Sequence, residues 1–389
     1  MATIQKQVRM VFDLNKCLGC HTCSMGCKTM WTDGRTDLQY PAGLDPLDGG
    51  KGLLYQYWNN VATAPGRDYP RGIFTPALGG GFDPATGLVD ISGNLPSIEK
   101  DYGAPWELNY DRVLKTEGGA ATATQLTLTP SPDGPDAYSS NWDEDVATGT
   151  YPNSYYFYLP RLCNHCTKPG CVAACPKHVP YKREEDGIVL IDQVRCEGYR
   201  FCVKGCPYKK TYFNPELKKT QKCVFCYPRL EQEPGSHQPP QPPRENFCFN
   251  QCVGRIRYSG YFNPNIAVMD PVNQAKNVNK LIDKWGVALR LHPEYGTEPN
   301  LFYIPPTSPP VFDATGALQP ATQRIPIDTL ADLFGDDVTQ THAARVARVQ
   351  QIFGLLDAER AKAAAGQSSE LTDILTAHSE ADRLQLYLG

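Results

Sequence analysis

Fifteen cysteines stand in four tight groups, and thiolates at such spacing are typical ligands of metal ions and iron–sulfur clusters. The groups are Cys17, Cys20, Cys23 and Cys27; Cys163, Cys166, Cys171 and Cys175; Cys196, Cys202 and Cys206; and Cys223, Cys226, Cys248 and Cys252. Four cubane clusters with four thiolates each would need about sixteen cysteines, one more than the chain has. Tyr199 stands where a C-x2-C-x2-C-x3-C run would have its second cysteine. The spacing therefore predicts three [4Fe-4S] clusters and one [3Fe-4S] cluster.

The fourth cysteine of such a run has a different task from the first three. Three thiolates separated by two residues each can hold three corners of one cluster, whereas the fourth ligates the neighbouring cluster in two-cluster ferredoxins. A proline follows Cys175 and Cys206, as it does in that bacterial pattern. No proline follows Cys27 or Cys252, so for the first and fourth groups the prediction depends on spacing alone.

Zinc is the main alternative for the fourth group, taken by itself. Its two cysteine pairs are separated by a linker only slightly longer than that of a zinc ribbon. The first group argues against zinc, because four thiolates within eleven residues cannot all close comfortably around one tetrahedral ion. A disulfide scaffold suits small secreted domains, and an odd number of cysteines cannot pair completely.

The composition is that of a globular chain with no general affinity for polyanions. The 389 residues are 41% hydrophobic, which is enough for two or three domains with a substantial core. A net charge of −4 gives no overall attraction for nucleic acid. No apolar run approaches the roughly 18 residues of a membrane span, and the first residues lack the apolar core of a signal peptide. We therefore expect any export to be arranged by a partner.

Motifs for chemistry other than electron transfer are missing. The sequence has no phosphate-binding loop and no convincing dinucleotide fingerprint. We expect His21 and His165, inside the cysteine loops, to be hydrogen-bonding or exposed residues rather than ligands. We also expect a solvated loop where five lysines cluster: Lys209, Lys210, Lys218, Lys219 and Lys222.

The elements between the cysteines are expected to be short. Residues 8–14 and 187–192 have the composition of strands, and residues 77–150, rich in Gly, Pro, Ser, Thr and Asp, predict a long surface insertion. Prolines predict a stiff, extended excursion inside the fourth group: Pro239, Pro240, Pro242 and Pro243. After Pro309, a helical extension should dock its apolar positions against the parent domain: Val346, Val349, Ile352, Phe353 and Leu356.

These patterns predict an α+β fold of two interleaved bacterial-ferredoxin-like modules with a long loop insertion and a helical C-terminal extension. The second and third groups lie about a turn and a strand apart, whereas almost two hundred residues separate the first from the fourth. One module is thus inserted in the other. The expected units are module A at 1–76 and 208–270, the insertion at 77–150, module B at 151–207, and the extension at 271–389, helical after about 328.

Beyond the cysteine runs, four segments carry a more specific resemblance. They are Tyr57–Val61, Tyr181–Gly187, Cys206–Lys210 and Cys252–Arg257. Together with the runs, they resemble the iron–sulfur beta subunits of type II enzymes of the dimethyl sulfoxide reductase family. That family includes nitrate, selenate, chlorate and perchlorate reductases and ethylbenzene, steroid C25 and dimethyl sulfide dehydrogenases. The motifs cover roughly residues 7–75 and 155–310, and we expect the chain to depart from shorter members elsewhere.

The resemblance implies a set of ligands for each cluster. The [4Fe-4S] cluster nearest the catalytic subunit would have Cys17, Cys20, Cys23 and Cys252. The next would have Cys27, Cys223, Cys226 and Cys248, and the third Cys163, Cys166, Cys171 and Cys206. The [3Fe-4S] cluster would have Cys175, Cys196 and Cys202, with Tyr199 covering the corner that lacks a thiolate.

The resemblance also implies partners and a location. A molybdenum bis-pterin alpha subunit would perform the chemistry, and a b-type haem gamma subunit would exchange electrons at the far end. Co-export with the alpha subunit would give a periplasmic location, with the cytoplasmic face of the membrane as the alternative. We expect no nucleic acid and no membrane span in this chain. The chain would be no enzyme on its own; the competing classes are a zinc-binding structural or nucleic-acid-binding module and a self-contained iron–sulfur enzyme.

Overall fold

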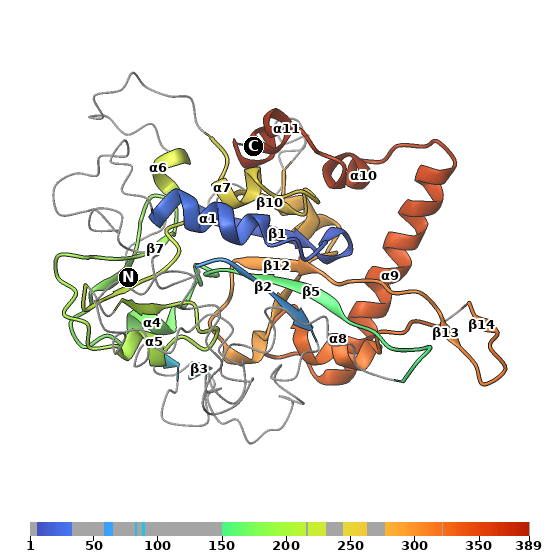
Figure 1. The fold of residues 1–389 in the computed structure, drawn as a ribbon, viewed down its shortest axis with the longest axis horizontal. Helices are drawn as coiled ribbons and strands as arrows, with labels where there is room; N and C mark the ends of the chain where they lie inside the picture. The colour runs from blue at the N-terminus through green and yellow to red at the C-terminus, as the bar shows by residue number, and fades with distance from the viewer. Residues whose placement is uncertain are drawn as a thin grey trace, which may run out of the picture.

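A five-stranded sheet forms the centre of the molecule, in a computed structural model that describes residues 6–32, 58–64, 82–83, 88–89, 150–214, 217–230, 244–262, 277–320 and 322–388. The strand order is β10–β1–β12–β11–β15. Figure 1 labels the first three of these strands, β10, β1 and β12. The strands are β1 (Gln7–Asp13), β10 (Arg257–Phe262), β11 (Leu289–Leu291), β12 (Leu301–Ile304) and β15 (Phe334–Gly335). β1 is antiparallel to β10 and parallel to β12, with Met10 opposite both Ser259 and Leu301.

β1 is buried on both faces, which explains its unbroken apolar run. Val8, Met10, Val11 and Phe12 have no solvent exposure, as expected of a strand covered on two sides. This confirms the strand predicted at 8–14. Asp13 ends it, because its carboxylate accepts a hydrogen bond from the Asn15 backbone N–H and caps η1 (Leu14–Lys16). The chain is thereby turned directly into the first cysteine loop.

Smaller ribbons and single turns surround this sheet. The pairs are β2 (Asn60–Ala64) with β5 (Phe157–Arg161), β3 (Phe82–Asp83) with β4 (Leu88–Val89), β6 (Pro180–Lys182) with β7 (Val189–Ile191), β8 (Tyr212–Asn214) with β9 (Lys219–Gln221), and β13 (Val311–Phe312) with β14 (Leu318–Gln319). Two further turns are η3 (Lys280–Lys284) and η4 (Pro293–Tyr295). β7 confirms the strand predicted at 187–192. Most of the predicted insertion at 77–150 and the four prolines at 239–243 lie outside the described residues.

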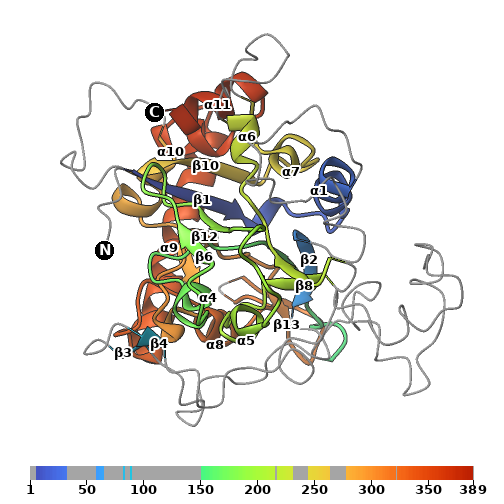
Figure 2. The ribbon, with the colours of Figure 1, turned by 90° about the vertical axis from the view of Figure 1, so that its left-hand side faces the viewer.

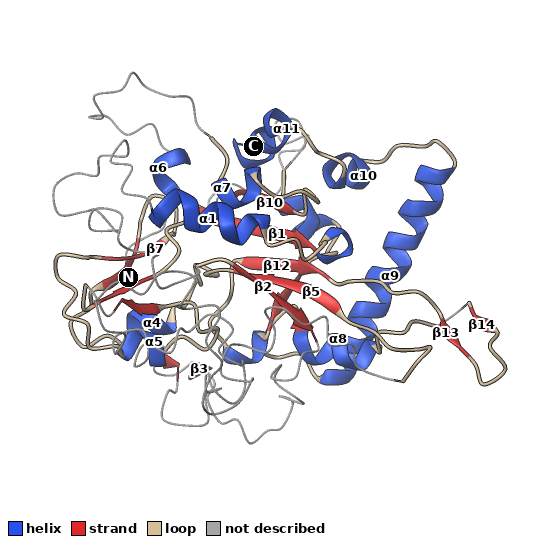
Figure 3. Cartoon of the chain, viewed as in Figure 1, coloured by secondary structure: helices blue, strands red, loops and turns tan. Residues whose placement is uncertain are grey.

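The last part of the chain is helical, as the sequence predicts. Its helices are α8 (Ile327–Leu333), α9 (His342–Ala364), α10 (Glu370–Leu375) and α11 (Glu380–Leu388), which lie around one end and one edge of the sheet (Figure 3). Val349, Ile352, Phe353 and Leu356 of α9 are buried in the main core, whereas Val346 is half-buried. The apolar face of α9 therefore docks on the parent domain. In the described residues, no helix is both long and apolar enough to cross a membrane.

The C-terminal segment is joined to the segments that carry the cysteines. It contributes β11, β12 and β15 to the same sheet as β1 and β10. Arg383 of α11 donates hydrogen bonds to the carbonyl oxygens of Phe249 and Arg257, at 3.2 and 2.8 Å. The Leu375 carbonyl, at the end of α10, accepts from the Lys16 ammonium and the Tyr258 hydroxyl. These helices hold both the entry to the first cysteine group and the exit from the fourth.

Candidate metal centres

Four helices each carry a cysteine from a different group. Cys23 lies in α1 (Thr22–Thr32), Cys171 in α4 (Gly170–Ala173), Cys202 in α5 (Phe201–Lys204) and Cys248 in α7 (Phe247–Asn250). A further short helix, α6 (Tyr227–Leu230), precedes α7. α1 packs against α7, and α4 packs against α5. Figure 2 shows the two pairs in separate parts of the molecule. The first cysteine group thus meets the fourth, and the second meets the third.

Glycines allow the helices of each pair to come close. Gly26 and Gly205 each stand directly before the fourth cysteine of their run. A Cβ on Gly26 would lie 3.1 Å from the Gln251 side chain, and one on Gly205 would lie 2.4 Å from the Cβ of Ala174. Gln251 and Ala174 stand directly before the fourth cysteines of the opposite runs. Equivalent positions therefore meet across both pairs, which brings each fourth cysteine to the partner run.

Four cysteines surround a hollow at the start of the chain's first helix. Cys17, Cys20 and Cys23 line it together with Cys252, around about 290 Å³ of empty space that opens to solvent. Cys252 comes from the far end of the fourth group, so a crossing cysteine completes these four. We call them the first set.

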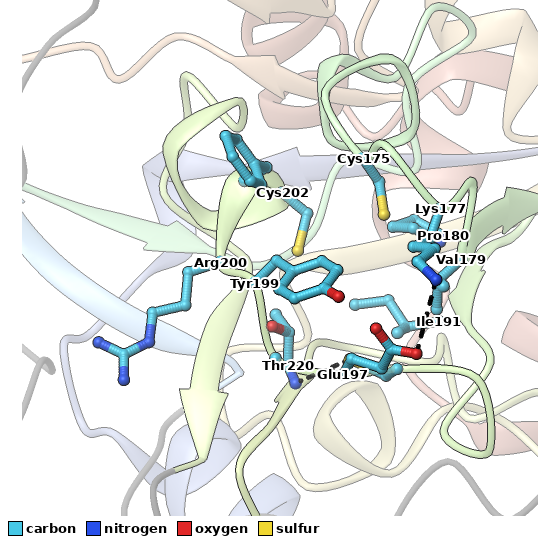
Figure 4. Close-up of a pocket in the computed structure, with 13 residues that line it drawn as sticks. Cys175, Lys177, Val179, Pro180, Ile191, Glu197, Tyr199, Arg200, Cys202 and Thr220 are labelled. Carbon is cyan, nitrogen blue, oxygen red and sulfur yellow. Dashed lines mark hydrogen bonds and ion pairs between the residues drawn. The ribbon is translucent and has the colours of Figure 1, made fainter.

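A second hollow collects the cysteines of the incomplete run. Cys175, Cys196 and Cys202 line about 330 Å³ of space together with Tyr199 (Figure 4). The Tyr199 ring lies beside Cys202 and is 54% exposed, and the Glu197 carboxylate raises the pKa of its phenol. The backbone N–H of Thr220 donates to the Cys196 sulfur at 3.3 Å. These three cysteines and Tyr199 are the fourth set.

The remaining cysteines form two further sets, and each of these cysteines is buried or half-buried. Cys27 is close enough to interact electrostatically with Cys223, Cys226 and Cys248, which form the second set with it. Cys171 interacts in the same way with the other members of the third set: Cys163, Cys166 and Cys206.

The neighbouring sets also approach one another. Cys248 of the second set interacts with Cys23 of the first, and Cys223 interacts with Cys163 of the third. Cys171 of the third set and Cys202 of the fourth belong to one small buried cluster. The sets thus follow one another through the protein. Each fourth cysteine, namely Cys27, Cys175, Cys206 or Cys252, lies with the opposite run.

All four loops share a left-handed residue two positions after their first cysteine. These residues are Gly19, His165, Gly198 and Phe225, with φ of 65°, 43°, 70° and 57°. A left-handed residue within a turn directs successive N–H groups to one side, and such concavities bind anions, including iron–sulfur sites. The N–H of Phe225 accordingly donates to the Cys223 sulfur at 3.4 Å. The loop of the third group keeps this conformation although Tyr199 replaces its second cysteine.

Burial makes the thiols poor anions in the absence of a cation. It raises the pKa of Cys17, Cys166 and Cys223 to about 12, and that of Cys202 to about 11. Within the described ranges, no three His, Cys, Asp or Glu side chains converge on a single ion. The sulfurs of the first and fourth sets instead surround open space, and several cysteine sulfurs accept hydrogen bonds from backbone N–H groups. An all-sulfur donor set of this kind fits iron–sulfur clusters, whose iron would supply the positive charge that keeps thiolates ionised.

Two of the five lysines expected in a solvated loop are buried, so that expectation is wrong for them. Lys210 is 3% exposed and donates to the Asn60 side chain and the Tyr212 hydroxyl. Lys222 is 2% exposed and donates to the carbonyl oxygens of Val189 and Cys223. Their hydrogen bonds are to groups beside the second and third sets, which a count of charges along the sequence does not reveal.

Histidine and arginine complete the surroundings. His165 is fully buried, and its Nδ1 accepts a hydrogen bond from the Val189 N–H at 3.0 Å, which confirms a hydrogen-bonding role. Sequence reasoning missed Arg257, which is fully buried and donates from Nη2 to the Cys23 sulfur at 2.9 Å. The only signal in the sequence was its place at the end of the Cys252–Arg257 segment.

Exposed apolar side chains gather beside the two outer sets. Leu18, Met25 and Val253 are exposed close to the cysteines of the first set, where Cys20 is itself exposed. Val194, Phe201 and Tyr199 are exposed in the run of the fourth set. Apolar groups exposed together are typical of contact surfaces.

Comparison with known proteins agrees with this arrangement. A family model described as a 4Fe-4S dicluster domain matches residues 154–261. The chain is 44% identical over 383 residues to the selenate reductase subunit beta of Thauera selenatis, covering 97% of this chain and 98% of the relative. It is 42% identical to the dimethylsulfide dehydrogenase subunit beta of Rhodovulum sulfidophilum, with 98% and 99% covered. Respiratory nitrate reductase 1 beta chain of Escherichia coli is 33% identical over 424 residues, with 85% and 76% covered.

The fold and its sulfur-lined sets define an iron–sulfur protein that transfers electrons and is not itself catalytic. The chain belongs to the iron–sulfur beta subunits of dimethyl sulfoxide reductase family enzymes. The similarity extends further than the sequence motifs indicated. Residues 77–150 and those after 310 fall almost wholly within the aligned length of the first two relatives, so they are not particular to this chain.

We expect Gly205→Ala to push α4 and α5 apart, because the new Cβ would meet that of Ala174 at 2.4 Å. Such overpacking costs about 1–3 kcal/mol, and it should lower the thermal stability and iron content of the purified protein. Adding Ala174→Gly should restore most of both. Gly354→Ala in α9, where a Cβ would meet nothing within 4 Å, is the control. A single variant that behaves like the parent protein would show that the helices do not need this close approach.

Proposed function

We propose that this chain is the electron-transfer subunit of a respiratory oxidoreductase and carries three [4Fe-4S] clusters and one [3Fe-4S] cluster. Its partners would be a molybdenum bis-pterin catalytic alpha subunit and a b-type haem gamma subunit. One observation supports this above all. Cysteines that are far apart in the sequence come together in four successive sets, and a crossing cysteine belongs to each of them.

The four sets correspond to the ligands proposed for four clusters. The first, second and third sets each offer four thiols, which suits [4Fe-4S] clusters. The fourth offers three thiols and the Tyr199 ring, which suits a [3Fe-4S] cluster. The bound clusters would supply sites that gain and lose single electrons. The protein's own part is to fix the sulfurs, to direct N–H groups at them and to keep water away from the inner sets.

The two ends of this succession suit different partners. The first set lies beside Leu18 and Val253, and we assign this end to the alpha subunit. The fourth set lies in a run that exposes Val194 and Phe201, and we assign this end to the haem subunit. Both outer sets open to solvent in the single chain. Partner subunits docked on these apolar side chains would cover the outer sets, whereas the cysteines of the second and third sets are already buried or half-buried.

The interleaved modules of the fold follow from the same crossing. We propose that module A, at 1–76 and 208–270, holds the first and second clusters, and that module B, at 151–207, contributes all the cysteine ligands of the other two. The α1–α7 and α4–α5 contacts support this division. The insertion at 77–150 would lie outside both modules.

We propose a periplasmic location by co-export with the alpha subunit, on the basis of the family resemblance. The cytoplasmic face of the membrane is the alternative. Relatives include a selenate reductase beta subunit and a dimethylsulfide dehydrogenase beta subunit. The direction of electron flow is therefore not a property of this family as a whole, and we assign the choice of substrate to the alpha subunit.

The proposed clusters predict the metal content. The complex, purified without oxygen, should contain about fifteen iron atoms in this chain, from three clusters of four and one of three. Acid-labile sulfide should accompany the iron at about sixteen per chain. The measurement is iron, zinc and sulfide analysis of the chain within its complex. Stoichiometric zinc with little iron would instead identify a zinc-binding structural module.

Tyr199→Cys tests the assignment of the [3Fe-4S] cluster. A thiolate at this position should allow a fourth iron to bind, which raises the iron content by about one per chain and lowers the reduction potential of that cluster. The electron paramagnetic resonance signal of the oxidised odd-electron cluster should then disappear. Tyr181→Cys, which places a thiol at another exposed tyrosine, is the control. A correctly folded Tyr199→Cys protein with an unchanged signal and iron count would contradict the assignment.

A further inference from the structure

Arg257, at the start of β10, lies fully buried among sulfur atoms. Its Nη2 donates to the Cys23 sulfur at 2.9 Å, and its Nη1 donates to the Asn59 side-chain oxygen at 2.8 Å. The guanidinium lies 4.6 Å from the centre of the Phe12 ring, which covers it from water. Its Nε is buried and makes no hydrogen bond. The side chain therefore retains an N–H group without an acceptor, in a place that solvent does not reach.

The charge of Arg257 acts on both of the first two sets. It interacts electrostatically with Cys17, Cys23 and Cys252 of the first set and with Cys248 of the second. Cys27 of the second set also feels this charge. Arg257 thus stands between two sets that are proposed to hold separate clusters.

No carboxylate balances this guanidinium in the part of the chain that the structure describes. Arg383 is a second buried arginine nearby, and its charge is balanced by an ion pair with Glu245. Burying a charge is costly unless an opposite charge compensates it. The ionisable groups that interact with Arg257 are thiols, and protonated thiols carry no charge. The compensating negative charge must therefore come from what the cysteines bind.

We propose that Arg257 is a positioning residue that serves as the shared buried countercharge of the first two clusters and raises their reduction potentials. This inference rests on the proposed function. A cluster gains negative charge when it is reduced, so a fixed positive charge beside it favours the reduced form. The hydrogen bond to Cys23 acts in the same direction, since hydrogen bonds to the sulfurs also set the potential. The reduction potential of the first cluster should be raised by both the charge and the hydrogen bond. That of the second cluster should be raised by the charge alone.

The experiment is a redox titration of the assembled complex, followed by electron paramagnetic resonance, with variants at three positions. Arg257→Gln removes the charge, and Arg257→Lys keeps the charge but loses the forked hydrogen bonds. Asn59→Asp keeps the shape of the side chain and places a carboxylate where Nη1 now donates. Arg255→Gln is the matched control, because Arg255 lies two residues away, is only half-buried and donates to the Asn250 carbonyl oxygen.

We expect Arg257→Gln to disfavour reduction of the first and second clusters. The equilibrium constant for reduction should fall by at least about tenfold, which lowers the potential of a one-electron couple by about 59 mV. The [3Fe-4S] cluster should keep its potential and serve as an internal reference. Asn59→Asp should shift the same two clusters in the same direction without leaving a cavity. Arg257→Lys should recover most of the shift, and Arg255→Gln should cause none.

Three results would overturn the inference. One is unchanged potentials in Arg257→Gln or Asn59→Asp proteins that retain all their clusters. Another is an equal shift of all four clusters, and the third is an equal shift in Arg255→Gln. If the Arg257→Gln protein does not accumulate, the potentials of the Asn59→Asp protein decide whether the inference holds. A parent complex without iron–sulfur signals would instead contradict the proposed function, so the two failures are distinguishable.

Discussion

The crossing of the fourth cysteine of each run is the constraint on which the rest of the structure depends. Cys252 joins the first set, and Cys175 joins the fourth, although each belongs to another part of the sequence. Such crossing requires two helices to approach closely, which explains Gly26 and Gly205 at the contacts. It also requires β1 and β10 to be neighbours, because the first group leaves one strand and the fourth group enters the other. Folding and cluster binding should therefore be tightly coupled.

Charge is the second feature that unites the site. Arg257, Lys210 and Lys222 are cations buried beside the inner sets, in a chain whose net charge is negative. Burial lowers the pKa of Lys210, although the thiols of Cys206, Cys163 and Cys223 raise it. Such positions are costly for a protein without bound anions. Clusters with thiolate ligands carry negative charge, so the same cations become favourable once the clusters are present.

The sequence was informative where one residue type decides the chemistry. Cysteine spacing predicted four clusters and the special position of Tyr199, whereas the members of each set were implied by the family resemblance. The structure places the cysteines of each set close to one another. The sequence also predicted β1, β7 and the helices after about 328, because local periodicity reports burial. It did not predict that residues 289–335 would complete the sheet of β1, since pairing between distant strands leaves no local pattern.

Buried charges were the other feature that sequence reasoning missed. Lys210 and Arg257 have no local pattern that separates them from less buried neighbours such as Lys218 and Arg255. Their burial depends on what surrounds them in three dimensions. For Arg257 the surroundings are Phe12, Asn59 and Cys23, which come from three separate segments. The sequence could have indicated only two of the four left-handed residues in the cysteine loops, because only two of them are glycines.

The most direct test of crossed ligation is to remove one crossing thiol and count the iron that is lost. Cys206 follows α5 in the third run but lies with Cys163, Cys166 and Cys171. In Cys206→Ala, we expect the chain to lose the iron of more than one cluster, or to stop accumulating, because both clusters of the module depend on the same helix pair. A stable protein that lacks only the cluster of its own run, with Cys196 and Cys202, would contradict the crossed arrangement.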